Sequence, residues 1–339
     1  MSETFRPVTA ITMGDPAGIG PEIVVGTMLD KGIHECCRPF VIGSQAIMEK
    51  AAKVLGKELK YNQISDPSEA KYEYGVIDIM ETGDYDTDSI EWGKVQKLAG
   101  QMAIDWIMKS IELGMAGKID AVSTSPIHKG AIKLIGIKEP GHTEIYQHAT
   151  NSPYALTMFS CHKLRVFFVS RHMSLVDACH YATKDVILDN VINIDKELRK
   201  VGIENPLIAV AGLNPHNGDN GLFGTEEITD IGPAVEAAKE RGINCVGPYP
   251  ADSVFHIGKS GKYDAILSLY HDQGHIACKT LDFEKSVTLT FGLPFIRSSV
   301  DHGTAFDIAG KGIAGSISLI ESTKVVAEYA AKQHERSEK

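Results

Sequence analysis

The sequence predicts an α/β protein with mostly parallel sheets covered by helices. Short apolar runs alternate with longer amphipathic patterns along the chain, which is the signature of strands joined through crossover helices. The 339 residues exceed what one compact core of ordinary size accommodates, so we expect two domains or lobes. No internal repeat and no low-complexity linker interrupts the pattern.

The first part of the chain supplies alternating strands and helices. Short apolar runs typical of buried strands occur at Val8–Met13, Pro39–Ile42, Val76–Met80 and Ala121–Thr124. Helical patterns occur at Gly20–Asp30, Gln45–Leu55 and about Trp92–Met115. The last is amphipathic, with apolar residues at Val95, Leu98, Met102, Ile107 and Ile111. A hinge between lobes is expected near Pro126–Gly141.

The second part begins with a loop, Pro140–Thr143, and a short helix. A hairpin is predicted from Leu156–Ser160 and Leu164–Val169 around Cys161-His162-Lys163. Helices follow at about Ser174–Ala182, Lys184–Val201, Asp230–Arg241 and Ile317–Gln333. Further strands are predicted at Leu207–Ala211, Ala265–Tyr270 and Val287–Phe291.

Composition excludes several classes of protein. The formal net charge of -10 argues against nucleic acid as a partner. No apolar run approaches the roughly 20 residues of a membrane helix, and the N-terminus lacks the basic and apolar sections of a signal peptide. The six cysteines form no C-x-x-C pair and are too sparse for a disulfide framework. We therefore expect reduced thiols in a cytoplasmic protein.

A glycine-rich loop, Gly14-Asp15-Pro16-Ala17-Gly18-Ile19-Gly20, follows the first strand and opens the first helix. Its glycines would let backbone amides approach a ligand at the positive helix end, and Pro21 suits the first helical turn. A tight strand-to-helix turn with no ligand explains the pattern equally well. The loop is neither a Rossmann fingerprint nor a Walker A loop. It is similar to the G-D-G-I-G-P-E opening of isocitrate and isopropylmalate dehydrogenases, so Gly14, Asp15, Gly18 and Gly20 are candidate cofactor-binding residues.

Three of the thirteen histidines each follow a predicted strand: His172, His216 and His271. In an open parallel sheet, ligands bind beyond the carboxyl ends of the strands. Three imidazoles there could hold a divalent metal and leave positions open for substrate. Ligands so far apart in sequence give no spacing test, and three hydrogen-bonded structural histidines remain an equally good interpretation.

Other polar residues in these segments are candidates for binding and proton transfer. Asp252 precedes a short helix, where an N-cap is the alternative role. Asp272 could orient His271 or a metal-bound water, and Lys279 lies one to two helical turns beyond. Arg297 suits bidentate capture of a carboxylate or phosphate. His142 and Thr143, at a predicted helix start, could also hold an anion. A solvated surface charge is the usual alternative for a single lysine or arginine.

Five long segments occur in a fixed order along the chain: ITMGDPAGIGPEI, PGHTE, LNPHNGDNGLFG-x-EE, YHDQGH and GLPFIRSSVDHGTAFDIAG. Through these segments, and over nearly its whole length, the chain resembles the 4-hydroxythreonine-4-phosphate dehydrogenase family of vitamin B6 synthesis. The resemblance implies two α/β/α lobes with a cleft between them, as in isocitrate and isopropylmalate dehydrogenases. We place the first lobe at residues 1–140 plus 300–339, and the second at residues 141–299, which would carry the metal and substrate residues.

The resemblance also implies site residues and assembly. The matching metal ligands are His172, His216 and His271, and the matching substrate-binding residues are His142, Thr143, Lys279 and Arg297. The family works as a homodimer in which one metal histidine comes from the partner subunit, and we assign that role to His271.

Three positions depart from the family pattern. Thr288 stands where the family usually has asparagine. His128 takes the place of the asparagine in the usual P-x-N-K segment, and Arg171 replaces the threonine that usually precedes His172. Threonine has a shorter reach than asparagine and a different set of donors and acceptors, so Thr288 is a candidate substrate-binding residue that bears on specificity. His275 in YHDQGH resembles a branch that acts on four-carbon sugar-acid phosphates such as D-threonate or D-erythronate 4-phosphate. Another relative oxidises a dihydrodiol of terephthalate.

The predicted reaction is a metal-dependent, NAD-linked oxidative decarboxylation, with NADP as an alternative cofactor. The substrate would be 4-hydroxythreonine 4-phosphate, giving 3-amino-2-oxopropyl phosphate. The alternative is D-threonate or D-erythronate 4-phosphate, giving dihydroxyacetone phosphate. One divalent metal per site (Zn, Mg, Mn or Co) would act as a Lewis acid. Lys279, Asp252 and Asp272 are the candidate catalytic residues. A non-catalytic metabolite-binding protein on the same scaffold is the hypothesis from another class.

Overall fold

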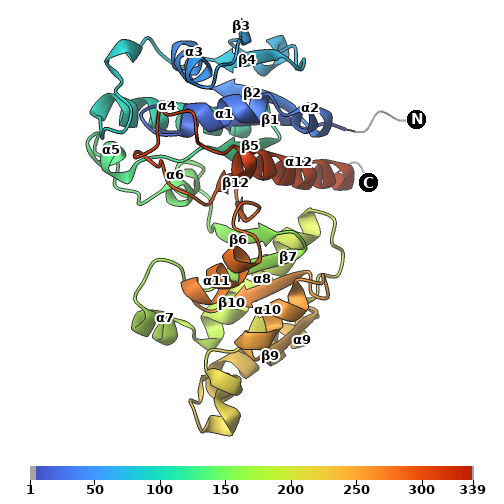
Figure 1. Cartoon of the computed structure of the whole chain (residues 1–339). Helices are drawn as coiled ribbons and strands as arrows, with labels where there is room; N and C mark the ends of the chain where they lie inside the picture. The colour runs from blue at the N-terminus through green and yellow to red at the C-terminus, as the bar shows by residue number, and fades with distance from the viewer. Residues whose placement is uncertain (1–4, 338–339) are drawn as a thin grey trace. The chain divides into compact units, whose positions relative to one another are not determined.

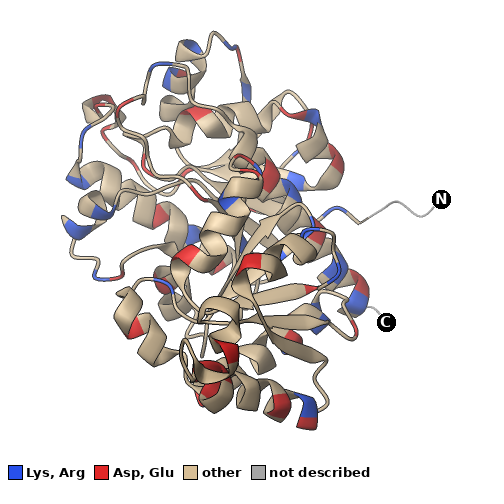
Figure 2. Cartoon of the chain, turned by 60° about the horizontal axis from the view of Figure 1, so that its bottom comes forward, with Lys and Arg blue, Asp and Glu red and all other residues tan. Residues whose placement is uncertain are grey.

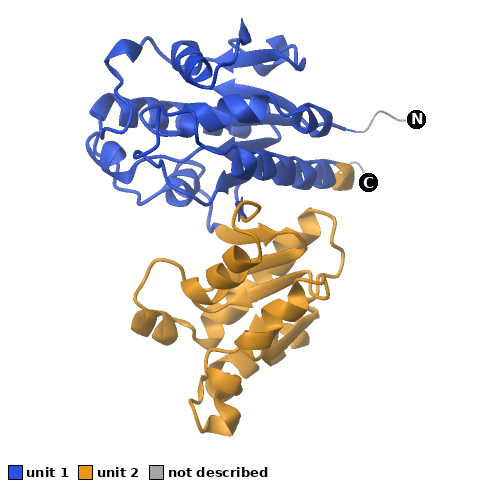
Figure 3. Ribbon diagram, in the orientation of Figure 1, with its two compact units in different colours: residues 1–155, 287–334 blue, residues 156–286, 335–339 orange. Residues whose placement is uncertain are grey.

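The computed structural model describes residues 5–337, which divide into two compact units (Figure 1). Of the described residues, unit 1 comprises 5–155 and 287–334, and unit 2 comprises 156–286 and 335–337 (Figure 3). The chain therefore leaves unit 1 after Ala155 and returns at Val287, whereas the sequence suggested boundaries near residues 140 and 300. The expected hinge segment Pro126–Gly141 lies within unit 1, where it contains a short helix.

The strands of unit 1 are parallel except for one. Its strand order is β3 (Lys60–Gln63), β4 (Val76–Met80), β2 (Arg38–Ile42), β1 (Val8–Thr12), β5 (Ala121–Thr124), β12 (Ile296–Val300) and β11 (Val287–Phe291). The exception is β11, which runs antiparallel to β12. The helices are α1 (Gly20–Met28), α2 (Lys31–Cys36), α3 (Gln45–Val54), α4 (Lys97–Met115), α5 (Lys129–Lys133), α6 (His142–Ala149) and α12 (Ile317–Ser337), with short turns η1 (Pro67–Glu69) and η2 (Thr87–Ser89).

Helices cover both faces of this sheet. Its central strands are therefore buried on both sides and show no alternation of apolar and exposed polar residues. Successive residues of a strand point to opposite faces. Ser123 of β5 hydrogen-bonds Ser322 of α12 on one face, whereas its neighbour Thr124 accepts a hydrogen bond from Arg297. The apolar core of unit 1 includes the fully buried Trp106 of α4 and Phe40 of β2.

Unit 2 repeats the same plan on a smaller scale. Its sheet order is β6 (Leu156–Cys161), β7 (Leu164–Phe168), β10 (Ala265–Ser268), β8 (Ile208–Ala211) and β9 (Cys245–Tyr249). The antiparallel strand here is β6, as one arm of the predicted hairpin with β7. The helices are α7 (Leu175–Tyr181), α8 (Lys184–Lys200), α9 (Gly232–Glu240), α10 (Ala251–Gly258) and α11 (His271–Leu281), with the turns η3 (Pro215–Gly221) and η4 (Glu227–Ile231).

The structure confirms the predicted fold class and adds three strands that the sequence did not reveal. β3 is a polar edge strand. β9 contains a glycine and a proline, and sheets tolerate proline in an edge strand. β12 reads IRSSV and lies between β5 and β11, yet it has no apolar run, because its middle positions are the buried Arg297 and Ser298 and the half-buried Ser299. Within residues 5–337, no helix is both long and apolar enough to cross a membrane.

Candidate functional site

The three predicted metal-ligand histidines follow three adjacent parallel strands of unit 2. β10 lies between β7 and β8 and pairs in parallel with both, so their carboxyl ends meet at one edge of the sheet. His172 follows β7, His216 follows β8, and His271 begins α11 directly after β10. The Ser170 hydroxyl donates to the Leu269 carbonyl at 2.8 Å and ties the first of these strand ends to the third. The topology thus places the three segments side by side, where ligands bind in sheets of this type.

The rings of His172 and His271 approach each other, with centroids 6.1 Å apart. Asp272 orients His271, because its Oδ1 lies 2.7 Å from His271 Nδ1. A carboxylate can only accept, so Nδ1 carries the proton and Nε2 is left available as a ligand atom. His275 stacks on His271 with ring centroids 3.7 Å apart and donates from Nδ1 to the His271 carbonyl.

His216 comes from a loop with an unusual backbone. Residues 216–220 all have positive φ, and four of the five are not glycine: His216, Asn217, Asp219 and Asn220. The left-handed conformation costs about 1–2 kcal/mol for an ordinary L-residue, although asparagine and aspartate tolerate it better. The surrounding contacts must therefore hold this loop in place, as is common at functional sites.

A cavity of about 410 Å³ brings His216 together with Asp252. Its other lining residues include Asn214, Tyr270 and Gln273. Asp252 lies in the first turn of α10 and is exposed, and Pro250 takes the N-cap position, so the cap role considered for Asp252 is not observed. Gln273 links two of the strand ends, since its Oε1 accepts from Leu269 N and its Nε2 donates to the Gly212 carbonyl, each at 2.8 Å. Sequence reasoning did not single out Gln273 or Tyr270.

No group of three histidine, cysteine or carboxylate side chains within residues 5–337 of one chain is arranged to hold a metal. The donor chemistry fits a divalent metal, because imidazoles at strand ends are among the commonest ligands. Lys279, the third candidate for proton transfer, lies on α11 with its ammonium 5.5 Å from the Phe283 ring.

The predicted anion-binding residues lie in unit 1. His142 and Thr143 form the first turn of α6, after the N-cap Gly141. The His142 Nε2 atom is buried and has no hydrogen-bond partner. Burial, together with the positive charge of Arg297, holds the pKa of His142 well below its usual value, so the ring is neutral.

Arg297 is 2% exposed and bridges three strands of the sheet of unit 1. From β12, its guanidinium donates to Thr124 of β5 at 2.8 Å and to Thr290 of β11 at 3.1 Å. The guanidinium carbon also lies 5.3 Å from the ring centroid of Tyr146. The solvated surface charge considered for this arginine is therefore not what the structure shows. Thr288 lies on β11 opposite Ser299 and is 9% exposed.

The glycine-rich loop is closely packed. A side chain at Gly14 would lie 2.4 Å from the Pro126 carbonyl oxygen, and one at Gly20 would lie 2.2 Å from that of Met13. The Asp15 carboxyl accepts from Ala17 N at 2.8 Å, while its Oδ2 is buried without a partner. Burial raises the pKa of Asp15 to about 6. The loop therefore presents a buried, weakly acidic carboxyl beside the start of α1, and the tight-turn interpretation accounts for Gly14 and Gly20.

The departure at His128 has a structural explanation. His128 is the N-cap of α5, and its Nδ1 accepts from the backbone amides of Gly130 and Ala131. Asparagine caps helices in the same manner. The ring also stacks on Phe306 at 4.6 Å, so histidine at this position preserves the cap and adds an apolar contact.

Comparison with known proteins identifies the family. The family described as "Pyridoxal phosphate biosynthetic protein PdxA" matches residues 35–326. The chain belongs to this family. A PdxA-family relative from Symbiobacterium thermophilum, named "Putative D-threonate 4-phosphate dehydrogenase", is 49% identical over 96% of this chain and 97% of its own length. The predicted family and the predicted dehydrogenase class are thereby confirmed.

Solved structures of PdxA-family relatives share the whole fold. A 4-hydroxythreonine-4-phosphate dehydrogenase from Burkholderia phymatum has a TM-score of 0.86 at 42% identity, covering 96% of this chain and 98% of that one. One from Klebsiella pneumoniae has a TM-score of 0.89 at 37% identity, covering 96% and 99%. Both of these solved relatives are named for 4-hydroxythreonine 4-phosphate, whereas the relative from Symbiobacterium thermophilum is named for D-threonate 4-phosphate.

Proposed function

We propose that this protein is an NAD-linked dehydrogenase that oxidises and decarboxylates a four-carbon hydroxy acid phosphorylated at C4. We favour D-threonate 4-phosphate, because the relative named for it is 49% identical, against 37–42% for the structures named for 4-hydroxythreonine 4-phosphate. The sequence alone ranked the latter substrate first, and it stays the second candidate because those structures share the whole fold.

The observation that carries this proposal is the pairing of Arg297 with a neutral His142 in unit 1. The His142 Nε2 atom is buried without a partner, and burial, together with the positive charge of Arg297, lowers the pKa of the ring. A phosphate oxygen would accept from Nε2–H, from the Thr143 hydroxyl and from the amides of the first turn of α6. The bound dianion would also neutralise the buried arginine.

The remaining residues would serve the two chemical steps. Hydride passes from C3 of the substrate to NAD, while Asp252 or Lys279 takes the proton of the C3 hydroxyl. The product is a β-keto acid, which loses carbon dioxide when the C2–carboxyl bond breaks. The electron pair left on C2 is then protonated, and D-threonate 4-phosphate yields dihydroxyacetone phosphate. Asp272 orients His271 throughout.

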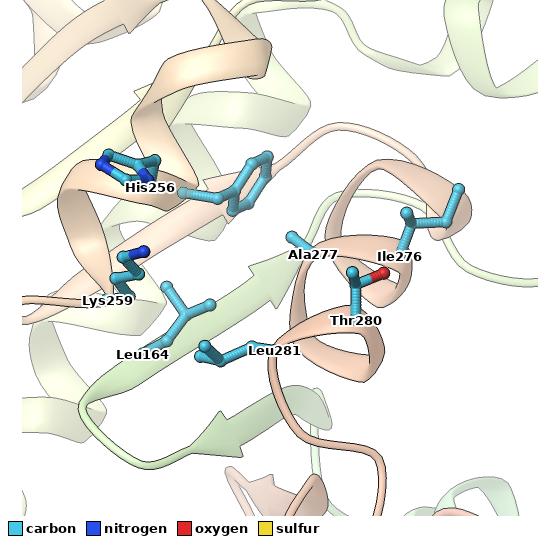
Figure 4. A pocket seen from close by; sticks show the side chains of 8 residues that line it. Leu164, His256, Lys259, Ile276, Ala277, Thr280 and Leu281 are labelled. Carbon is cyan, nitrogen blue, oxygen red and sulfur yellow. The ribbon is translucent and has the colours of Figure 1, made fainter.

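A divalent metal on His172, His216 and the partner subunit's His271 would supply Lewis acidity to the substrate oxygens. The exposed face of α11 supports assembly with a second copy, because Ile276 and the nearby Phe283 are 63% and 61% exposed. A cavity of about 390 Å³, lined by Leu164, Phe255 and Leu281 among others, lies beside Ile276 (Figure 4). Apolar surface of this kind marks protein interfaces. A second copy would cover it and supply the third ligand.

The glycine loop Gly14–Gly20 would bind NAD or NADP, with the partnerless Asp15 Oδ2 available to accept from the cofactor. Both acidic and basic residues are visible along the chain in the view of Figure 2. All six cysteines are free thiols, and a cytoplasmic location stays a prediction.

The first test is NADH formation with NAD, a divalent metal and a panel of phosphorylated acids. We expect turnover with D-threonate 4-phosphate to exceed that with 4-hydroxythreonine 4-phosphate. The reverse order would restore the second candidate. No NADH with any acid would favour a protein that only binds metabolites.

Arg297→Lys is expected to raise KM for the phosphorylated acid strongly. Lysine keeps the positive charge, but its ammonium group lacks the planar guanidinium that donates to both Thr124 and Thr290. The charge would therefore lie at a different place relative to the bound phosphate. Each lost hydrogen bond to a charged group also costs about 1.5–3 kcal/mol, so Tm should fall. Arg38→Lys, on β2, is the control for replacement of a half-buried arginine. A lower Tm with an unchanged KM would leave Arg297 a purely structural role.

Thr288→Asn is expected to shift the ratio of kcat/KM between the two phosphorylated acids. These substrates differ at C2, which carries a hydroxyl in one and an amine in the other. Making or breaking one buried hydrogen bond to the substrate changes discrimination by about 1–3 kcal/mol. The ratio is measured with both substrates on one preparation, so the amount of active enzyme cancels. An identical ratio in the variant would show that Thr288 does not read C2.

A further inference from the structure

The left-handed loop that carries His216 is fastened by one buried carboxylate. Glu227 is 6% exposed and lies at the start of η4. Its Oε1 accepts from the backbone amides of Leu213 and Asn214, at 2.8 and 2.7 Å. Its Oε2 accepts from the Asn214 side-chain amide at 2.9 Å. These contacts hold the two residues that join β8 to the loop.

The packing around Glu227 leaves the loop little freedom to move. A Cβ atom on Gly218, in the middle of the left-handed run, would lie 2.9 Å from Glu227 Oε2 and 2.6 Å from the Gly224 carbonyl oxygen. A Cβ atom on Gly212 would lie 3.3 Å from Glu227 Oε1. The loop therefore packs over the Glu227 carboxylate. At Gly212 and Gly218 its backbone comes so close to neighbouring atoms that only glycine fits without a shift.

The chemistry of these contacts requires a carboxylate. Each group that the structure directs at the two oxygens of Glu227 is a donor, so both oxygens must accept. A glutamine of the same shape would place an NH₂ group against the NH₂ group of Asn214. The neighbouring Glu226 makes a single side-chain contact with Asn214, at 2.7 Å, and is half-buried.

We propose that Glu227 is a positioning residue that holds the left-handed loop and thereby sets the place of the His216 imidazole. The metal-related part of this inference rests on the proposed function, in which His216 is a ligand. The loop-holding part does not, because it concerns the backbone of the metal-free protein. Glu227 touches neither substrate nor cofactor in this scheme and acts through His216 alone.

The test compares Glu227→Gln with Glu226→Gln, the same chemical change one residue earlier. Hydrogen exchange of peptides that cover residues 212–220 is measured on metal-free protein. Co(II) affinity is measured by equilibrium dialysis, and kcat and KM are measured separately. In Glu227→Gln we expect exchange to rise about tenfold or more as the loop opens. We expect Co(II) affinity to fall by about 10–100-fold, the usual effect of losing a residue that orients a metal ligand. Turnover should fall with KM nearly unchanged, and Glu226→Gln should change each quantity less than about twofold.

Each outcome bears on a different part of the inference. Equal exchange in the two variants would show that Glu227 does not hold the loop. Faster exchange with unaltered Co(II) affinity and kcat would make Glu227 a structural residue only, which also overturns the proposal. If wild-type protein binds no Co(II), the proposed metal site fails and the exchange result still decides the loop-holding part. If Glu227→Gln does not fold, Asn214→Ala removes one of the three contacts and should show the same changes at smaller size.

Discussion

Replacing His216 by alanine is expected to abolish nearly all turnover while leaving the fold intact. The His216 side chain is exposed, so its removal leaves no cavity in the core and should change Tm little. The imidazole lies on the cavity with Asp252, where we propose that it holds the metal. Its loss would remove one of three ligands and with it tight divalent-metal binding.

Metal binding, Tm and NADH formation should be measured on the same preparation of His216→Ala after treatment with a chelator. His180→Ala, an exposed histidine of α7 in the same unit, serves as the control and should behave as wild type. If the His216 variant keeps full activity after metal has been removed and restored, the assignment of this ligand is wrong.

Mixing two inactive variants, His172→Ala and His271→Ala, is expected to restore activity. The resemblance to the family implies a metal site shared between subunits, and we propose that the partner subunit's His271 completes it. A mixed dimer would then have one site with both lesions and one site with neither. Random subunit exchange makes half of the dimers mixed, so recovery should reach about a quarter of the wild-type activity.

The matched control mixes His172→Ala with His216→Ala. Both lesions would then fall on the same side of a shared site, so each site of the mixed dimer lacks one ligand and no activity returns. Subunit exchange is verified independently with differently tagged chains. No recovery from the first pair, despite proven exchange, would place all three histidines in the site of one subunit and overturn the shared-site hypothesis.

The positions of the candidate residues along the fold were predictable to different degrees. His172, His216 and His271 could be placed at strand ends because the strands before them are apolar runs, and the parallel pairing of β7, β10 and β8 agrees with that placement. The buried setting of Arg297 could not be predicted, because β12 has no apolar pattern. Its guanidinium is satisfied by two threonines. Thr124 lies more than a hundred residues earlier in the chain, and Thr290 lies opposite Arg297 on the neighbouring strand of a hairpin.

The local geometry of the site was the least predictable part. The letters Pro215-His216-Asn217-Gly218 suggest a turn, but they do not predict five consecutive residues with positive φ. In our proposal this loop is held by a carboxylate that lies eleven residues beyond His216 and that binds the backbone just before the loop. The pairing of His216 with Asp252 in one cavity likewise depends on tertiary contacts. The sequence indicates which residues can bind or react. The distances between those residues are set by other side chains, which follow no recognisable sequence pattern.

The three-strand bridge of Arg297 has a consequence for how substrate preference changes in this family. In our proposal, the side chain that anchors the phosphate also fastens β12 to β5 and β11, so selection for folding and selection for phosphate binding act on one residue. A mutation that released the phosphate would also weaken the sheet, and it would be lost for that reason before its effect on substrate mattered. New substrates would therefore arise by exchange of groups at the opposite end of the substrate, near C2, while the phosphorylated end stays the same.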